Sequence, residues 1–436
     1  MSARRILAAL LLACGAAVPA APQAPDSLAA LAREAYRDAA EAYRAGDFAR
    51  ARQGMVRAAS VWPAQPAYLY AAAGLSARVA DTAAAAEWLE RLAALGFWRD
   101  VRAAGDFGPV LGAPAITRAI ARLAPNGEPL ARSRIAFTIP APDFFAEGID
   151  VDPSADEWFV TSVRHGSIAK IDRTGAIVEI TPPADAPLGA LLGVRVDRSR
   201  RLLWVSTKMF PMFGRYRSGA PGGSGVAVYD LSKRAWLGRA AVPDDGRPHW
   251  LGDLVLTAEG DALLTDSESP VIYRARLSGG RLEIEPWLEH RMFRSLQGAA
   301  LDETGRTLFV ADYSHGLFAV QAGTRAVRHL PTGPGASALG IDGLAWWRGS
   351  LIGIQNGGGP PRVIRIRLAA DQGSVESVET IDRHLPVASE PTIGTLVGDR
   401  LYYVADSHWP LYDDEGKLRS GATLGPTHIL ELELQP

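Results

Sequence analysis

Hydrophobic and polar positions follow two different periods along this chain. From about Asp26 to Leu123, apolar residues recur three and four positions apart, as they do on one face of a helix. From Arg134 onward they alternate with polar residues in short runs separated by glycine-containing turns, a pattern typical of β-strands. The change falls at Pro125-Asn126-Gly127-Glu128-Pro129, whose composition predicts a turn and a domain boundary.

The β part of the chain repeats one hairpin unit. In its clearest copy, an apolar strand at Leu296–Asp302 leads through Glu303-Thr304-Gly305 into a second strand at Arg306–Asp312. Counting this copy from Gln297, the units begin at positions 147, 192, 252, 297, 342 and 390, so successive units lie 45 to 60 residues apart. Repeats of about 40–50 residues with several short strands each are typical of a β-propeller. Six copies predict a six-bladed β-propeller.

The two ends of the β part predict how the ring closes. The strand at Arg134–Ile139 precedes the first hairpin unit, and the sixth unit, which ends with the strand at His428–Leu434, lacks a fourth strand of its own. We therefore expect Arg134–Ile139 to form the outer strand of the last blade, which leaves no gap between first and last blades. The propeller is predicted to occupy residues 132–436.

The helical segment, residues 26–125, repeats with a period of 34 residues and resembles a tetratricopeptide repeat. Its matched positions are Ala51, Met55 and Ala58 in one unit and Ala85, Leu89 and Leu92 in the next. The sequence thus predicts a small all-α tetratricopeptide-like domain in front of the propeller. Two repeats are few for an independent stack, because each needs a neighbour to cover its apolar face. Two interpretations stay open: a docking surface for another protein, or a cap that stabilises the propeller.

Residues 1–21 have the features of an export signal. Arg4-Arg5 precedes an apolar run, Ile6–Ala13, that is too short to span a bilayer. Leu11-Leu12-Ala13-Cys14 resembles a lipobox, whereas Val18-Pro19-Ala20 resembles an ordinary cleavage site, and both alternatives stay open. We expect an exported protein, either periplasmic or tethered to the bacterial envelope through Cys14, with no other membrane contact.

Composition and charge narrow the possible partners. The chain has 436 residues, too many for one ordinary core, and a formal net charge of −2. Such a charge gives no basic field for nucleic acid, so no nucleic-acid partner is expected. The expected partner is a small-molecule substrate or ligand at the mouth of the propeller. Cys14 is the single cysteine, so no disulfide can form within the chain.

Two long loops interrupt the even spacing of the units. One runs over residues 208–225 and the other over residues 408–427, each after the second strand of its hairpin. The end of an antiparallel second strand lies beside the start of the first strand, so both loops are expected on the face where the hairpins begin. Long loops in compact domains are more often functional than accidental.

The first residues of the hairpins predict a polar site on the propeller axis. They are Glu147, Leu192, Gly252, Gln297, Asp342 and Glu390. Carboxylates that converge in a narrow site repel one another, and a divalent cation with oxygen ligands would relieve that repulsion. Asp253, which follows Gly252, is a further candidate ligand.

The ends of the second strands add candidates for substrate binding and proton transfer. His165, His315 and His408 fall at matching places in three units, where they could act as acid or base, as metal ligands or as donors to a substrate. Arg164, Asn356 and His408, together with Glu390, are the predicted substrate-binding residues.

Several motifs resemble the gluconolactonase/regucalcin family of six-bladed propellers. They are E-G-I-D-V-D-P at 147–153, W-F-V-T-S-V-R-H-G at 158–166, L-Q-G-A-A-L-D-E-T-G-R-T-L-F-V-A-D at 296–312 and I-D-G-L-A-W at 341–346. The resemblance implies a divalent metal, Ca²⁺ or Zn²⁺, held at the axial mouth by a Glu, two Asn and an Asp, and lactone hydrolysis with the Asp as base. Glu147 and Asp342 match the Glu and the Asp. Gln297 replaces one Asn, and Gly252, followed by Asp253, replaces the other.

These observations lead to two hypotheses. In the first, the protein is a metal-assisted hydrolase of a lactone or related ester, with Glu147, Gln297, Asp342 and Asp253 as metal ligands. Asp342, His165 and His315 would then be the catalytic residues. In the second, the propeller is a non-catalytic module that binds a small ligand or a protein partner, and the helical unit is a docking surface.

Overall fold

The computed structural model describes residues 28–172, 174–218 and 223–435. The predicted export segment, including Cys14, lies outside the described residues. The chain divides into two compact units, one made of the chain up to Glu128 with residues 332–337 and 358–360, and the other made of the remainder. No helix in the described part of the chain is long and apolar enough to cross a membrane.

The first unit is helical, as the period of its apolar residues predicts. Its elements are α2 (Leu28–Arg44), α3 (Phe48–Val61), α4 (Pro66–Arg78), α5 (Thr82–Ala94), the 3₁₀ turn η1 (Gly105–Val110) and α6 (Pro114–Gly127). Helices α3 and α5 begin 34 residues apart and are capped alike. Asp47 accepts a hydrogen bond from the backbone N–H of Arg50 at 3.0 Å, and Asp81 accepts one from Ala84 at 3.1 Å.

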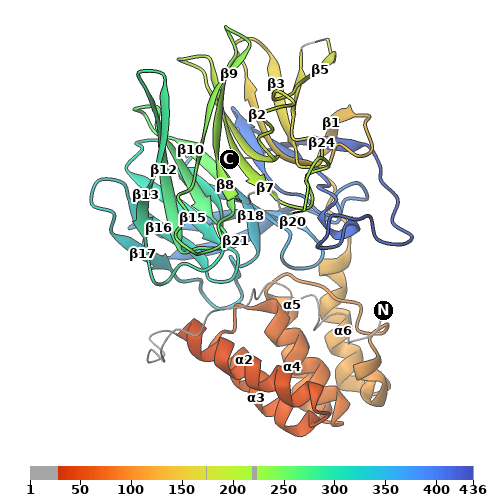
Figure 1. Ribbon diagram of the computed structural model, residues 1–436. Coiled ribbons are helices and arrows are strands. Elements are labelled where there is room, and N and C mark those ends of the chain that lie inside the picture. Colours follow the sequence, from red (N-terminus) through yellow and green to blue (C-terminus); the bar gives the residue numbers. More distant parts are fainter. Residues whose placement is uncertain (1–27, 173, 219–222, 436) are drawn as a thin grey trace. The chain divides into compact units, whose positions relative to one another are not determined.

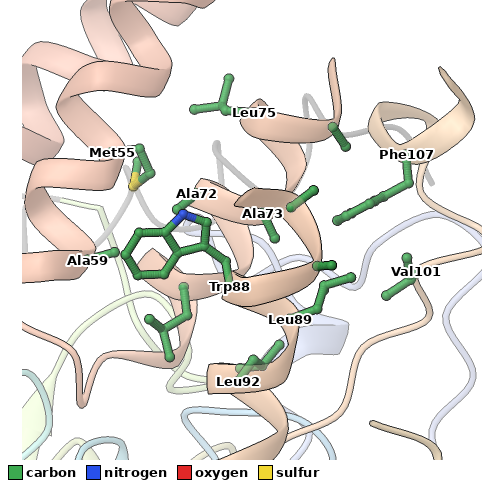
Figure 2. Packing of buried hydrophobic residues seen from close by; sticks show 14 of the residues in the cluster. Met55, Ala59, Ala72, Ala73, Leu75, Trp88, Leu89, Leu92, Val101 and Phe107 are labelled. Carbon is green, nitrogen blue, oxygen red and sulfur yellow. The ribbon is translucent and has the colours of Figure 1, made fainter. Parts of the chain in front are cut away.

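Alanine lets the helices of this unit approach one another closely. Figure 2 shows Trp88 among smaller side chains, including Ala59, Ala72 and Ala73, with Met55 and Leu89 nearby. The unit thus has a core of its own, and the tetratricopeptide-like helical segment predicted from the sequence is present.

The second unit is a six-bladed β-propeller, and each blade is a four-stranded antiparallel sheet (Figure 1). The first three blades are β2 (Ala146–Asp152) to β5 (Ile177–Ile180), β6 (Ala190–Asp197) to β9 (Ala235–Ala241), and β10 (Leu251–Leu256) to β13 (Arg281–Glu289). Their middle strands are β3 (Glu157–Ser162), β4 (Ile168–Ile171), β7 (Leu202–Met209), β8 (Gly223–Asp230), β11 (Ala262–Asp266) and β12 (Val271–Ser278).

The fourth and fifth blades have the same plan, and the sixth closes the ring. The fourth is β14 (Leu296–Leu301), β15 (Thr307–Asp312), β16 (Gly316–Gln321) and β17 (Val327–Leu330). The fifth is β18 (Ile341–Trp347), β19 (Ser350–Gln355), β20 (Arg362–Leu368) and β21 (Val375–Arg383). The sixth is β22 (Gly394–Val397), β23 (Arg400–Val404), β24 (Thr427–Glu433) and β1 (Arg134–Ile139). Strand β1 pairs with β24, so the predicted closure is confirmed.

Hydroxyl groups join neighbouring blades near the axis. Ser206 Oγ donates to the Gly252 carbonyl at 2.7 Å, and Thr265 Oγ1 donates to that of Gln297 at 2.6 Å. Thr161 Oγ1 donates likewise to the carbonyl of Leu192 in the second blade. These bonds satisfy buried carbonyls and fix the register between blades.

Candidate functional site

Six residues, one from each blade, form what we call the floor ring. The inter-blade hydroxyl bonds and the close approach of glycine Cα atoms to the next blade identify them as Glu147, Leu192, Gly252, Gln297, Asp342 and Thr392. The sixth position corrects the alignment predicted from the sequence. A Cβ added at Gly343 would lie 2.6 Å from the Thr392 carbonyl, so Thr392 and not Glu390 is the equivalent of Asp342.

A second ring lies two residues before the first, and we call it the mouth ring. Five of its six members precede the first strand of their blade, so contacts and not strand alternation place them: Phe145 and Ala190 pack with Leu192 of the floor ring. Its members are Phe145, Ala190, Trp250, Ser295, Gly340 and Glu390. Glu390 lies near the axial carboxylates, because its charge raises the pKa of Glu147 and the charge of Asp342 raises the pKa of Glu390.

Glu147 is a deeply placed carboxylate. Its side chain is held in β2, and the residue is only 9% exposed. Burial raises the pKa of Glu147 well above its usual range, and the charges of Asp342 and Glu390 raise it further. Trp409 Nε1 donates a hydrogen bond to Glu147 Oε2 at 2.7 Å and acts in the opposite direction, because it favours the ionised carboxylate.

Asp342 is held by an amide. Asn356 Nδ2 donates to Asp342 Oδ2 at 2.8 Å and to the Pro391 carbonyl at 3.0 Å, and the Tyr313 hydroxyl donates to Asn356 Oδ1 at 2.9 Å. Burial raises the pKa of Asp342 to about 7, even though the hydrogen bond from the Asn356 side chain acts to lower it. Asp342 is enclosed by protein yet keeps some solvent-accessible surface, as expected for a side chain that lines the axial channel.

Glu390 adds a third carboxylate to the site. It lies outside the regular strands and forms an isolated bridge with Asp406. Burial raises the pKa of Glu390 to about 8, and the charges of Asp342 and Asp406 contribute to the shift. The main electrostatic neighbours of Glu147 and Glu390 are thus carboxylates, so the negative charge of the site is poorly compensated.

Asp253 differs from these three because a base neutralises it. Arg195 Nη2 lies 3.1 Å from Asp253 Oδ1, and the backbone N–H groups of Leu254 and Ala299 donate to the same carboxylate. These bonds occupy both oxygens of a side chain that is 2% exposed. The structure therefore places Asp253 in an ion pair between neighbouring blades, and we leave it out of the proposed ligand set.

Gln297 and Gly252 lie next to each other at the floor. Gln297 Nε2 donates to Ser295 Oγ at 3.4 Å, and Gln297 Oε1 is 3.8 Å from the point where a Cβ of Gly252 would lie. Nothing else lies within 4 Å of that point, so the floor has an open space at the third blade.

The donor set suits a hard divalent cation better than a soft one. Glu147, Asp342 and Gln297 offer oxygen atoms, the ligands that Ca²⁺ and Mg²⁺ prefer. Among the described residues, no group of three or more His, Cys, Asp or Glu side chains is arranged to hold a metal ion. Whether the floor suits a divalent cation therefore depends on two carboxylates and one amide oxygen, and on the poorly compensated negative charge around them.

The two long loops meet above Glu147. Trp409 begins the 3₁₀ turn η2 (Trp409–Leu411), and its ring contacts Phe145 at 4.8 Å, Trp250 at 5.6 Å and Phe210 at 6.1 Å between centroids. Phe210 belongs to the first long loop, so an aromatic cluster covers the axial carboxylates on the side of the hairpin starts.

Arg164 holds the two loops together. Its Nη1 donates to the carbonyls of Met212 at 3.3 Å and Gly416 at 3.1 Å, one in each loop, and its guanidinium lies over the Tyr412 ring. The guanidinium of Arg164 is engaged in these contacts, so the structure gives Arg164 a structural role in place of the predicted substrate-binding one.

Two of the three histidines, His165 and His315, bond to partners outside the two axial rings. His165 Nδ1 lies 3.2 Å from Glu179 on the outer strand β5, and its Nε2 lies 3.2 Å from Asp143. His315 Nδ1 donates to the Met292 carbonyl at 3.0 Å. The imidazole of His165 is thus held by the outer strand of its blade and by Asp143, and that of His315 by the segment before β14.

His408 lies beneath the aromatic cluster. It is 2% exposed, has a left-handed backbone with φ of 60°, and contacts Phe145 at 6.3 Å between rings. Burial lowers the pKa of His408, although the charge of Asp406 opposes that shift. His408 is too enclosed to contact a substrate, and we assign it a role in supporting the loop.

Sequence reasoning missed three residues that shape the site: Trp409, Tyr313 and Arg195. Trp409 stood out only as an aromatic residue in a long loop, and Tyr313 as the residue after the second strand of the fourth unit. The signal for Arg195 was its place within a strand otherwise rich in apolar side chains. A charge at such a position calls for a partner in the adjacent blade.

Comparisons with known proteins give likenesses to solved structures alone. No protein-family model and no curated protein sequence matches the chain. A gluconolactonase from Xanthomonas campestris is 14% identical, with a TM-score of 0.46 over 71% of this chain and 93% of that one. A calcium-binding regucalcin from Agrobacterium tumefaciens is 14% identical, with a TM-score of 0.46 over 69% of this chain and 96% of that one. A virginiamycin B lyase from Staphylococcus aureus is 12% identical, with a TM-score of 0.43 over 69% of this chain and 99% of that one. No activity is transferred from these likenesses, because a shared fold does not determine function.

Proposed function

We propose that this propeller hydrolyses a lactone or related ester, assisted by a divalent cation at the floor ring. The observation that carries the proposal is the convergence of Glu147, Asp342 and Glu390 in a desolvated site whose main electrostatic neighbours are other carboxylates. Without a bound cation, such a site lowers the stability of the folded protein, because buried like charges repel. A bound cation offsets this repulsion, and it would also be available to assist hydrolysis.

Three floor residues would hold the cation: Glu147, Asp342 and Gln297. When bound there, it would polarise the substrate carbonyl and stabilise the negative charge that develops on its oxygen. Each carboxylate has one oxygen already engaged, Oε2 by Trp409 and Oδ2 by Asn356. Glu147 Oε1 and Asp342 Oδ1 are therefore the oxygens available to cation, water or substrate.

Asp342 is the residue we assign as general base. A pKa of about 7 lets its carboxylate accept a proton near neutral pH, which is where a base works best. In the proposed reaction water adds to the carbonyl carbon and gives a proton to Asp342. The ring C–O bond then breaks, and that proton passes to the leaving oxygen, so the product is a hydroxy acid. Asn356 and Tyr313 act by holding Asp342 in place.

One observation favours the second candidate, a propeller that binds a ligand without turning it over. Trp409 caps Glu147, and Gly252 gives the floor no side-chain oxygen in the third blade. A floor with two carboxylates and one amide could bind a cation or a cationic ligand without the complete set of ligands that the related family pattern implies.

A lactone panel tests the proposal. Hydrolysis would be followed by acid release in the presence of Ca²⁺, Mn²⁺ or Zn²⁺, for the unaltered protein and for Asp342→Asn. Asp414→Asn, the same change at an exposed position in the second long loop, is the matched control. We expect Asp342→Asn to lose at least a hundredfold, the low end of the usual contribution of about 10²–10⁴ from a general base. Equal rates for Asp342→Asn and the control would remove Asp342 from the mechanism.

Export and partner binding belong to the same proposal. Residues 1–21 would direct the chain out of the cytoplasm, with Cys14 as a lipid anchor or with cleavage after Ala20, and the helical unit would dock a protein partner. Mass spectrometry of the mature N-terminus from a bacterial host distinguishes a diacylated Cys14 from a free Ala21.

A further inference from the structure

The axial mouth is polar on one half and apolar on the other. In the mouth ring, blades one to three contribute Phe145, Ala190 and Trp250, whereas blades four to six contribute Ser295, Gly340 and Glu390. In the floor ring, the second and third blades contribute no polar side chain, only Leu192 and Gly252, whereas the other four blades contribute polar ones. Phe145, Ala190 and Leu192 are buried, so Trp250 is the apolar residue of these two rings that keeps part of its surface exposed.

The loops enlarge the apolar half. Phe210 contacts Trp250 at 4.8 Å between ring centroids, and both contact Trp409. All three keep part of their surface exposed, in contrast to Phe145, which is fully buried beneath them. Because the rings already touch one another, a ligand would lie along their exposed edges and not between them.

Polar groups near these rings are engaged elsewhere. Lys208 Nζ donates to Glu268 Oε2 at 2.8 Å and to the His249 carbonyl at 2.9 Å while it lies 4.3 Å from the Trp250 ring centre. Arg164 is bound to the two loop carbonyls described above. The apolar half thus offers few hydrogen-bonding groups to a substrate rich in hydroxyls.

We infer that the substrate is a lactone or ester with an apolar acyl or aryl body, a conclusion that rests on the proposed hydrolase function. Its carbonyl lies at Glu147 and Asp342, and its body lies along Phe210, Trp250 and Trp409. A sugar lactone in the same place would exchange its hydrogen bonds to water for contacts with ring carbons, which is unfavourable. An alkyl chain gains free energy from the same contacts.

Chain length provides the test. Rates would be measured with Ca²⁺ for δ-lactones carrying alkyl chains of increasing length and for δ-gluconolactone, and calorimetry would measure binding of the matching δ-lactams. Trp250→Ala and Phe210→Ala remove parts of the apolar half. Trp236→Ala, a partly exposed tryptophan on the outer strand β9, is the matched control, and thermal melting verifies that each variant folds.

We expect kcat/KM to rise by about two- to fourfold for each added methylene, the factor that buried methylene groups supply. Trp250→Ala and Phe210→Ala should each flatten this dependence, whereas Trp236→Ala should not. Hydrolysis that is independent of chain length, or fastest with δ-gluconolactone, overturns the inference but leaves the hydrolase standing. Lactam binding that strengthens with chain length, without hydrolysis of any lactone, supports the apolar mouth and refutes the hydrolase. No lactam binding and no chain-length dependence refutes the inference.

Discussion

The indole N–H of Trp409 and the carboxylate of Glu147 are joined by a hydrogen bond of 2.7 Å although they are 262 positions apart in the sequence. Indole can only donate, so the bonded oxygen of Glu147 must accept whether or not the carboxyl is protonated. The bond favours a proton on Oε1, because the carbonyl-type oxygen of a protonated carboxyl is the better acceptor, and Oε1 is the oxygen left for the axial site.

Trp409→Phe tests what this bond does. The ring stays but the donor is lost, so we expect the pKa of Glu147 to rise further and the affinity for Ca²⁺ at neutral pH to fall several-fold. The free energy of unfolding should drop by about 1–3 kcal/mol, the usual cost of an unsatisfied buried acceptor. Calorimetric titration and urea denaturation measure the two effects. Trp236→Phe is the control, because Trp236 Nε1 has no hydrogen-bond partner among the described residues; equal effects of the two changes would rule out a special role for Trp409.

Stability should depend on pH in a direction set by the raised pKa values. The unfolded chain ionises its carboxyls near pH 4, whereas Asp342 and Glu390 hold their protons to about pH 7 and about pH 8 in the folded protein. Between these limits the unfolded chain binds fewer protons, so the free energy of unfolding falls as the pH rises from about 4 to 8. Urea denaturation at several pH values, without divalent cations, measures the slope.

Two comparisons check the source of that slope. Asp342→Asn removes one of the shifted groups, so its stability should decline less between pH 5 and pH 8. Added Ca²⁺ should restore stability at pH 8 more than at pH 5, because the cation competes with protons for the same oxygens. A slope unchanged by both would place the titrating groups elsewhere.

Gly252→Asn should strengthen cation binding. A side chain there would meet little but Gln297 Oε1, and it would supply the amide oxygen that the third blade lacks. We expect a lower Kd for Ca²⁺ by calorimetry and a normal fold. Gly252→Ala separates the effect of the amide from that of added bulk, and unchanged Ca²⁺ affinity in Gly252→Asn would show that this position faces no cation.

Arg195→Met tests the assignment of Asp253 to a structural ion pair. It leaves a carboxylate that is 2% exposed without its base, so we expect a loss of about 3–5 kcal/mol in unfolding free energy. Arg281→Met is the control. Arg281 is paired with Glu283 at 3.0 Å but its side chain is 82% exposed, so its loss should cost about 0–1 kcal/mol. A small effect of Arg195→Met would return Asp253 to the candidate cation ligands.

The fold could be predicted because its signals are local. Alternating side chains mark each hairpin, with a glycine turn in four of the six, as in Leu296–Asp312, and six copies then determine the blade count. The closing strand β1 could be inferred because the last unit lacked a partner for β24. Glu390 was misaligned because Thr392 is followed by Ile393 and not by the glycine that marks four of the other blades.

The site was harder to predict because it depends on contacts between distant segments. Glu147 and Asp342 could be identified from their strands, and the structure does bring them together with Glu390. The bond from Trp409 and the pair between Arg195 and Asp253 depend on how loops and blades meet, which no local pattern shows. The histidines were misjudged for the same reason: equal places in the repeat do not require equal side-chain directions.

A calorimetric titration with Ca²⁺ tests the central claim most directly. At pH 6.5, in two buffers of different ionisation enthalpy, we predict binding to one site with proton release, because Asp342 and Glu390 hold protons at that pH. The double variant Glu147→Gln/Asp342→Asn should give neither the binding heat nor the proton release. The absence of binding by the unaltered protein at millimolar Ca²⁺, or equal binding by the double variant, would contradict a cation site at the floor of the propeller.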